Sequence, residues 1–452
     1  MKQKKKEAIV LTEGSIWKQL LCFSLPILFG NVFQQTYNMV DSAIVGQFVG
    51  DTALAAVGSS SNIIMLLLSA FYGISMGAGV VISRYYGAGD WDGVSRGVHT
   101  MVAFGLAGGI GFTIIGELLT PYILKWIGTP AEVMAQSQIY FRIFFAGTVF
   151  SALYNIGGGI LRAVGDSKSP LYYLIVSCIL NTVLDLLFVV VFHWGIAGTA
   201  WATVISQCVS CVMTFHKLME EGTVYRVFVS KIRFHGRELK GIVSIGLPSG
   251  VQNSIVSLSN IVVQASINAF GAMALAGYGA YSKIDGFAMM PASAFAMATT
   301  TFVSQNIGAG NYKRVKKGAC VGMFLNLLTA ESIGIILSIF APVFLRIFTD
   351  DPEIIGYGAL QASIVGPFFC LCAGTHAIAG ILRGGGKSTL PMLVIILFWC
   401  GLRMTWITFV ARPAHVIHLV FWAYPLTWSC TFLVLGIYCL KSGWLKKIEE
   451  KA

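Results

Sequence analysis

The chain has 452 residues, of which 56% are hydrophobic and 11% charged, and its formal net charge is +11. Soluble proteins carry about a quarter charged residues, so an assembly of soluble domains is excluded. Charge-free stretches such as residues 97–116 and 171–192 are long enough for the roughly 20 residues that a helix needs to cross a bilayer. Backbone that faces lipid must satisfy its own hydrogen bonds, and the alternating pattern of a membrane barrel is absent, so these stretches are predicted to be transmembrane helices.

Taken in chain order, the apolar stretches predict twelve spans and therefore an all-α integral membrane protein. Six spans lie in each half, at residues 17–46, 53–85, 95–118, 131–162, 170–192 and 196–219, and then at 241–268, 274–306, 317–340, 353–383, 389–411 and 416–440. Three prolines, Pro26, Pro248 and Pro291, lie inside spans. Each removes one helical hydrogen bond, so a bend is expected at each.

Short motifs recur at a fixed distance of 221 residues. Gly-Ile-Leu-Arg at 159–162 returns at 380–383, and Gly-Ala-Gly at 87–89 returns at 308–310. Units of this length are not solenoid repeats, so the constant offset indicates two homologous halves with almost no insertion between the motifs. Internal repeats in an apolar chain are typical of secondary transporters, whose substrate site lies where the repeats meet.

Lysine and arginine gather before the first span, in alternate loops and after the last span, whereas the opposite loops hold only Lys125, Arg346 and Arg412. By the positive-inside rule both termini and the segment between the halves are cytoplasmic. The halves then start on the same side, as parallel repeats related by a pseudo-twofold axis along the membrane normal. The expected division is an N-terminal six-helix lobe, a cytoplasmic linker, a C-terminal six-helix lobe and a cytoplasmic tail, at residues 1–219, 220–240, 241–440 and 441–452.

The positive charge is explained by this topology and by contact with anionic headgroups of membrane lipids. Nucleic-acid binding is the weaker interpretation, because no basic soluble domain exists to carry it. The expected location is a plasma membrane, of the bacterial inner-membrane kind, with a multi-pass monomer in it.

Two carboxylates lie inside predicted spans, Asp41 in the first and Asp185 in the fifth. A carboxylate inside a bilayer is costly and marks a functional site by default. Asn181 and Asp185 are four residues apart and share one helix face. Positions 221 residues further on hold Val262 and Trp406, so the acids belong to one half only. This asymmetry favours a coupling-ion site over a repeated structural bridge, the alternative being that each Asp only hydrogen-bonds a neighbouring helix.

Other residues in the spans leave two interpretations open. Lys283 and Asp285 share the eighth span and are candidates for a buried charge pair, either structural or functional. Met289 can line an adaptable substrate pocket, although packing is the more common role of methionine. Arg403 is a single charge in the eleventh span, for which snorkelling or local pairing is expected.

The chain resembles the multidrug and toxic compound extrusion (MATE) family, nearer its DinF-type branch. The residues that carry the resemblance are Leu25-Pro26, the stretch Gln34-Gln35-Thr36-Tyr37-Asn38-Met39-Val40-Asp41, the paired Gly-Ala-Gly turns and the paired Gly-Ile-Leu-Arg segments. The resemblance implies twelve helices in two six-helix lobes around a central cavity. It also implies export of amphipathic, often cationic, organic compounds in exchange for H⁺ or Na⁺, without a cofactor.

The same resemblance assigns roles to particular positions. The implied cation site, which would also be the only place for Na⁺, consists of Asp41, Asn181, Asp185 and Thr203. The implied substrate contacts in the first lobe are Gln34, Tyr37 and Asn155. Some family members carry an acid on the seventh helix, but residues 251–262 have none here.

Two alternatives remain beside an antiporter. Flippases of lipid-linked oligosaccharides share the broad architecture, but they often have extra helices and a more basic cavity, which this chain does not clearly show. An integral-membrane enzyme would need a convergent catalytic set, and none is recognisable, so no enzymatic activity is expected. The choice between H⁺ and Na⁺ stays open at this point.

Overall fold

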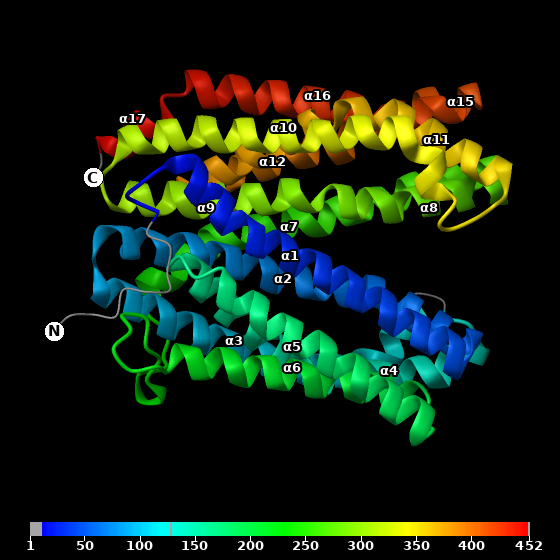
Figure 1. Ribbon diagram of the computed structural model, residues 1–452, viewed down its shortest axis with the longest axis horizontal. Helices are drawn as coiled ribbons and strands as arrows, with labels where there is room; N and C mark the ends of the chain where they lie inside the picture. The colour runs from blue at the N-terminus through cyan, green and yellow to red at the C-terminus, as the bar shows by residue number, and fades with distance from the viewer. Residues whose placement is uncertain (1–10, 127–128, 451–452) are drawn as a thin grey trace. The chain divides into compact units, whose positions relative to one another are not determined.

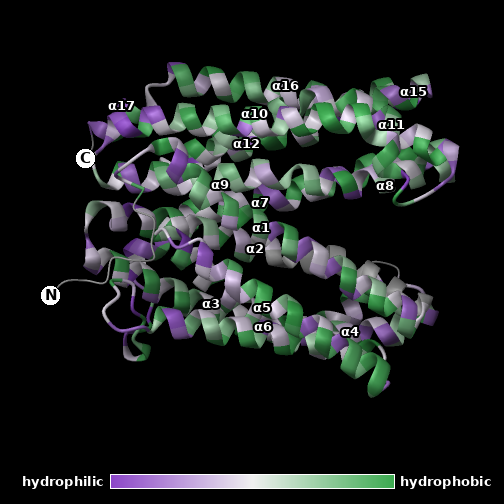
Figure 2. Cartoon of the chain, in the orientation of Figure 1, coloured by the Kyte–Doolittle hydropathy of each residue, from purple (hydrophilic) through white to green (hydrophobic). Residues whose placement is uncertain are grey.

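The computed structural model describes residues 11–126 and 129–450, apart from most side chains between 51 and 70, and every regular element in this range is helical (Figure 1). Hydrophobic residues run along the whole length of the long helices (Figure 2). Ten helical runs in the described residues are long and apolar enough to cross a membrane. Helices α2 and α7, with 38 and 32 residues, complete twelve spans. The predicted all-α membrane fold is therefore confirmed.

The first six spans are formed by six helices, two of which end in a π-helical segment. They are α1 (Ile16–Ile44, continued by Val45–Val49), α2 (Asp51–Ala88), α3 (Trp91–Trp126), α4 (Ala131–Ala163), α5 (Lys168–Asp185, continued by Leu186–Val191) and α6 (Ile196–Leu218).

The last six spans contain more interruptions. Their elements are α7 (Gly236–Ile267), α8 (Ala272–Ala288), α9 (Met290–Gly308), α10 (Tyr312–Leu345), α11 (Pro352–Val365), α12 (Phe369–Gly384), α13 (Thr389–Ile395), α14 (Arg403–Trp406), α15 (Arg412–Ala414) and α16 (Ile417–Lys441), followed by the short α17 (Trp444–Glu449). Helices α8 and α9 together form the eighth span, α11 and α12 the tenth, and α13 to α15, joined by π-helical segments, the eleventh.

Two of these breaks have clear causes. Helix α8 ends just before Pro291, as the sequence predicts, because proline cannot continue the hydrogen-bond ladder. The break between α11 and α12 was not predicted. There a 3₁₀ turn, Gly366–Phe368, separates the helices, and Glu331 Oε2 of α10 accepts a hydrogen bond from the Cys370 backbone N–H at 3.0 Å. The carboxylate thus stabilises the exposed first turn of α12.

The described residues separate into two compact units: unit 1 holds 29–246, and unit 2 holds 11–28 and 247–450. Both boundaries fall within a few residues of a proline inside a helix, Pro26 in α1 and Pro248 in α7. The first part of α1 therefore belongs to unit 2, and the first part of α7 belongs to unit 1.

The backbone repeats the pattern found in the sequence. Residues with positive φ occur in matching pairs: Gly50 and Gly271 (110° and 99°), Gly89 and Gly310 (70° and 69°), Gly165 and Gly386 (96° and 81°), and His193 and His415 (56° and 50°). The three glycine pairs are 221 residues apart, but the histidine pair is 222 apart. Each unit therefore contains the same turns, and one residue has been added within the eleventh span.

A contact between helices locates this shift. Cys178 Sγ faces the carbonyl of Phe33 at 3.9 Å, and Cys400 Sγ faces the carbonyl of Ile255 at 3.5 Å, so both partners differ by 222. Cys400 lies in the π-helical segment Ile396–Leu402, and a π turn holds one residue more than an α turn. The alignment of the acids with Val262 and Trp406 is therefore wrong by one residue.

With the corrected register, the counterparts of Asp41 and Asp185 are Val263 and Ile407. Neither is acidic, so the asymmetry inferred from the sequence stands.

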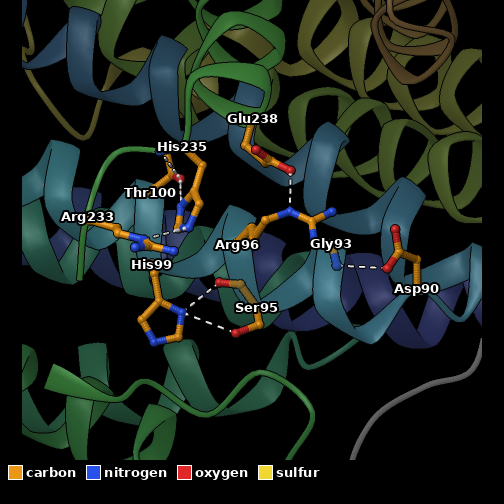
Figure 3. Close-up of polar contacts among 9 residues, drawn as sticks. All are labelled: Asp90, Gly93, Ser95, Arg96, His99, Thr100, Arg233, His235 and Glu238. Atoms are coloured by element: carbon orange, nitrogen blue, oxygen red, sulfur yellow. Dashed lines mark hydrogen bonds and ion pairs between the residues drawn. The ribbon is translucent and has the colours of Figure 1, made fainter. Parts of the chain in front are cut away.

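The segment between α6 and α7 is held against α3 within unit 1 (Figure 3). His99 Nε2 accepts a hydrogen bond from the Phe228 backbone N–H at 3.0 Å, and its Nδ1 lies 2.6 Å from the Ser95 carbonyl oxygen. Thr100 Oγ1 lies 3.0 Å from His235 Nδ1. Because His99 bonds on both ring nitrogens, its Nδ1 carries the proton and its orientation is fixed.

An ion pair continues this attachment into α7. Arg96 Nε of α3 lies 2.8 Å from Glu238 Oε1, and Glu238 is buried (Figure 3). Asp90 Oδ1 accepts from the Gly93 N–H at 2.8 Å at the start of α3. The connection between the halves is therefore a docked segment and not a loose tether.

The chain before α1 is attached to unit 2 by one arginine. Arg314 of α10 donates to the carbonyl oxygens of Leu11, Glu13 and Gly14 at 3.3, 2.9 and 2.8 Å, and to Gln19 Oε1 at 2.7 Å. Leu11 is fully buried, so this turn is a packed part of unit 2.

Candidate functional site

The candidate site in unit 1 lies where two helices change to π-helical geometry. Asp41 is near the end of α1, just before the segment Val45–Val49, and Asp185 is the last residue of α5 before Leu186–Val191. Short π-helical stretches are often found at functional sites. Here the local change in helical register presents both carboxyl groups to the interior of unit 1.

The four residues of the implied cation site come together from three helices. The Asn181 amide, oriented by its hydrogen bonds, donates to Asp185 Oδ2 at 2.8 Å and accepts from the Thr203 backbone N–H at 3.2 Å. Thr203 Oγ1 lies 3.2 Å from the hydroxyl of Tyr37. The carboxyl groups of Asp41 and Asp185 are within hydrogen-bonding reach of each other. The structure thus brings α1, α5 and α6 to one polar centre.

This centre is buried and incompletely bonded. Asp41 is 8% exposed and Asp185 is 0% exposed, and among the described residues no partner reaches the Oδ1 atom of either. Two ionised carboxylates in contact inside an apolar bundle repel strongly. The pair must therefore share a proton or hold a cation between its oxygens.

Tyr140 of α4 belongs to the same centre and was missed by the sequence analysis. It is buried, and its hydroxyl lies close enough to feel the charge of both Asp41 and Asp185. Its core neighbours include Val45, Val133 and Ile196. A single tyrosine in an apolar helix gives no periodic signal, so only the packing of α4 reveals it.

Comparison with known proteins agrees with this arrangement. The family profile described as MatE matches residues 26–187 and 248–407, one match in each half of the chain. The chain belongs to the MatE family.

Relatives of this MatE protein align over nearly the whole chain. It is 30% identical over 395 residues to the probable multidrug resistance protein YpnP of Bacillus subtilis, covering 87% of this chain and 88% of that protein. It is 29% identical to the probable multidrug resistance protein YoeA of the same organism, with 96% of both chains covered. A solved MOP superfamily transporter from Pyrococcus furiosus superposes with a TM-score of 0.91 at 22% identity, over 99% of this chain and 100% of that one. These matches establish the fold of a multi-pass membrane protein.

The remaining candidate substrate contacts are placed separately. In unit 1, Gln34 is partly exposed on α1, and Asn155 of α4 donates from Nδ2 to the Ser151 carbonyl at 2.8 Å. In unit 2, Met289 lies at the junction of α8 and α9 and packs against the hydrophobic core. Each is accessible or near a helix break, but the structure of the single units does not join them into one site.

The predicted Lys283–Asp285 pair is not formed. Lys283 is exposed and its ammonium lies 5.3 Å from the ring centroid of Phe348, while no described residue bonds to Asp285 Oδ1. Residues two apart on a helix point to different faces, which explains the separation. In the described residues, no group of three or more His, Cys, Asp or Glu side chains could hold a metal ion.

Arg403 also differs from its expectation, because it does not snorkel. Its side chain is 1% exposed and is the largest fully buried side chain in the described residues. It lies in the eleventh span between the π-helical segments Ile396–Leu402 and Ile407–Ala411. In the corrected register Arg403 is the counterpart of Asn181. The signal was present in the sequence, but the offset of 221 misaligned it by one residue.

Proposed function

We propose that this protein is a secondary antiporter that exports small organic compounds in exchange for a cation bound at Asp41 and Asp185. The observation that carries the proposal is the contact of two buried carboxyl groups, with Asn181 and Thr203 beside them. Such a pair costs free energy unless a cation relieves the repulsion. A centre of this kind is suited to bind and release a positive charge.

The surrounding atoms suit either coupling ion. A proton on one carboxyl group allows it to donate a hydrogen bond to the other. Sodium would instead use hard oxygen ligands, namely the carboxylates, the Asn181 amide oxygen and the Thr203 hydroxyl. The direct approach of Asp41 to Asp185 favours H⁺ in this arrangement, because a bound Na⁺ would have to separate their oxygens.

Cation binding would act through the packing of α1 against α5 and α6. Protonation of Asp41 or Asp185 changes which hydrogen bonds join these helices, and so biases one packing arrangement over another. Substrate and cation then need not share a site, since coupling requires only that they prefer different conformations. Gln34, Tyr37, Asn155 and Met289 are the proposed substrate contacts.

Several features support export across a plasma membrane. Relatives named as multidrug resistance or multidrug export proteins occur in Bacillus subtilis and Staphylococcus aureus. The lysine and arginine distribution supports cytoplasmic termini. The proposed partners are therefore small organic substrates and membrane lipids.

The experiment is transport in proteoliposomes with H⁺ and Na⁺ gradients imposed separately. A fluorescent organic cation is loaded on the cytoplasmic side, and its movement is followed with wild-type protein and with Asp41→Asn. We expect gradient-driven transport by the wild type and none by the variant. Equal rates for both proteins under either gradient would exclude the mechanism.

A further inference from the structure

Unit 2 contains a cluster of buried hydrogen-bond donors around Arg403. The guanidinium lies 4.4 Å from the ring centroid of Tyr424 and 5.7 Å from that of Trp399. Nη1 donates to Asn260 Oδ1 at 3.3 Å, and Nη2 donates to Thr427 Oγ1 at 3.1 Å. All the partners are neutral, so the cluster carries a net positive charge.

Three donors of this cluster have no acceptor in the described residues. They are Arg403 Nε, Trp399 Nε1 and the neighbouring Trp428 Nε1, whose side chains are 1%, 6% and 5% exposed. The rings of Trp399 and Trp428 are 6.3 Å apart. Guanidinium and indole N–H groups can only donate, and a buried donor without an acceptor costs about 1–3 kcal/mol. Three of them around one cation call for an acceptor that is not a side chain of the described residues.

No ion pair in the described part of the chain supplies this acceptor. The printed partners of Arg403 include no carboxylate, and the arginine cannot lose its proton to become neutral. Asp285 lies in the same unit and acts electrostatically on Tyr424 and Cys372, yet it forms no salt bridge with Arg403. A buried charge without a counter-ion is strongly unfavourable.

Helix α7 offers a polar route to the cluster. Asn253, Ser257, Asn260 and Gln264 lie four, three and four residues apart, so at 100° per residue they form one narrow stripe. The last three are exposed, and Asn260 is the residue that contacts Arg403. The exposed apolar residues Leu258 and Ile261 lie on a different face. Exposed amides are unfavourable against lipid, so the stripe is suited to water and polar solutes.

We propose that Arg403, Trp399 and Trp428 form an anion-binding site that holds the carboxylate of an aromatic organic acid or a free monovalent anion. The guanidinium and indole N–H groups supply the hydrogen bonds, which are strongest to an ionised acceptor. The Trp399 and Tyr424 rings supply an aromatic surface for the organic part of such a ligand. The role of this site in export rests on the proposed function, whereas the binding itself does not.

Binding is tested on the purified full-length protein by equilibrium dialysis in gluconate buffer, without a membrane gradient. The probes are 2-naphthoate and the equally sized cation 2-naphthylmethylammonium. We expect wild type to bind naphthoate more tightly than the cation. Arg403→Gln should weaken naphthoate binding about tenfold or more, because hydrogen bonds between charged groups contribute most. Trp399→Phe removes one donor but keeps an aromatic ring, and should weaken binding less.

Matched variants on exposed positions serve as controls. Arg346→Gln and Trp422→Phe change the same residue types where both are exposed, and they should leave binding unchanged. If Arg403→Gln does not elute as a folded protein, Trp399→Phe and the preference of wild type for the anion still decide the question. Inhibition by added chloride identifies a site for free inorganic anions; Arg403-dependent naphthoate binding that chloride does not inhibit identifies a carboxylate site.

Two results would overturn the assignment. One is equal affinity of wild type for the anion and the cation, and the other is naphthoate binding that is the same in Arg403→Gln and Trp399→Phe as in wild type. Failure of the export proposal gives a different outcome: anion binding persists, but no gradient drives transport.

Discussion

The two units have the same backbone plan and opposite charge at corresponding positions. In unit 1 the fifth span presents Asn181 and Asp185 to Asp41 of the first span. In unit 2 the eleventh span presents Arg403, the counterpart of Asn181, to Asn260 of the seventh. The contact between the paired spans has been kept through duplication, while the side chains at its centre have diverged from an acid pair to a buried cation.

This difference separates two kinds of chemistry. Carboxyl groups can gain or lose a proton, so unit 1 can switch between charge states as a cation binds and leaves. A guanidinium stays charged, so unit 2 cannot switch in this way and can only attract a negative group. Both centres lie beside π-helical segments, which indicates that the repeat provides a polar position whose use depends on the residue it holds.

The strongest test of this division compares one acid from each unit. Asp41→Asn preserves the shape of the side chain but removes its charge, and we expect transport under an H⁺ or Na⁺ gradient to fall to the level of empty liposomes. Asp285→Asn in unit 2 should leave the dependence on the gradient intact, because Asp285 has no acidic partner comparable to Asp185. Loss of gradient dependence in the Asp285 variant, with Asp41→Asn active, would place the coupling site in the wrong unit.

A second test moves the residue of unit 2 into unit 1. Asn181→Arg would introduce a fixed positive charge beside Asp41 and Asp185. The guanidinium should neutralise both carboxylates and take the place of the transported cation. We expect the transport rate to become independent of pH and of Na⁺ concentration, measured in proteoliposomes at several pH values. Asn181→Gln keeps an amide and serves as the control; an unchanged ion dependence in Asn181→Arg would show that the two positions are not equivalent.

The outline of the fold could be predicted from the sequence because long apolar stretches and fixed motif spacing are strong signals. Pro291 gave the α8–α9 break, whereas the break before α12 depends on Glu331 reaching the Cys370 N–H from another helix. Such a contact is set by tertiary packing and has no local pattern.

The cation site could be predicted in part. Asp41 and Asp185 are recognisable as acids in apolar spans, but Tyr140 and the buried state of Arg403 are not. A single arginine has the same sequence signal whether it snorkels or is enclosed by Trp399 and Tyr424. The π-helical insertion also shifts the repeat by one residue, which no motif in the sequence revealed.

The charge of Arg403 should make unit 2 more sensitive than unit 1 to the loss of one hydroxyl. Thr427→Val removes an acceptor from the guanidinium, and hydrogen bonds to charged groups contribute about 1.5–3 kcal/mol. Thr203→Val removes a bond between two neutral hydroxyls, for which about 0.5–1.5 kcal/mol is expected. Thermal unfolding in detergent should therefore show the larger loss of stability for Thr427→Val. The reverse order would indicate that Arg403 does not depend on Thr427.

Paired glycines in the two units allow a similar comparison of packing. A Cβ on Gly380 would lie 2.8 Å from the Ala296 carbonyl oxygen, which is backbone and cannot move away easily. A Cβ on Gly159 would instead meet the Ser75 hydroxyl, a small side chain that can rotate. Gly380→Ala should destabilise by about 1–3 kcal/mol, and Gly159→Ala by less. Equal shifts in the unfolding temperature would show that Ser75 is as rigid as the backbone, which its hydrogen bond to the Asn155 carbonyl could cause.

The smallest effect is expected at Lys283, which might have been the partner of Asp285 but lies over Phe348 instead. An exposed contact between an ammonium and an aromatic ring contributes about 0.5–1 kcal/mol. Lys283→Ala should therefore change the unfolding temperature only slightly and should leave transport unchanged. Lys283→Met keeps the apolar stem and isolates the contribution of the charge. If Lys283→Ala instead destabilised the protein as much as Thr427→Val, the ammonium would have to be compensating the buried carboxylate of Asp285. Unit 2 would then hold an internal ion pair, and its polar centre would resemble that of unit 1 more closely than Arg403 suggests.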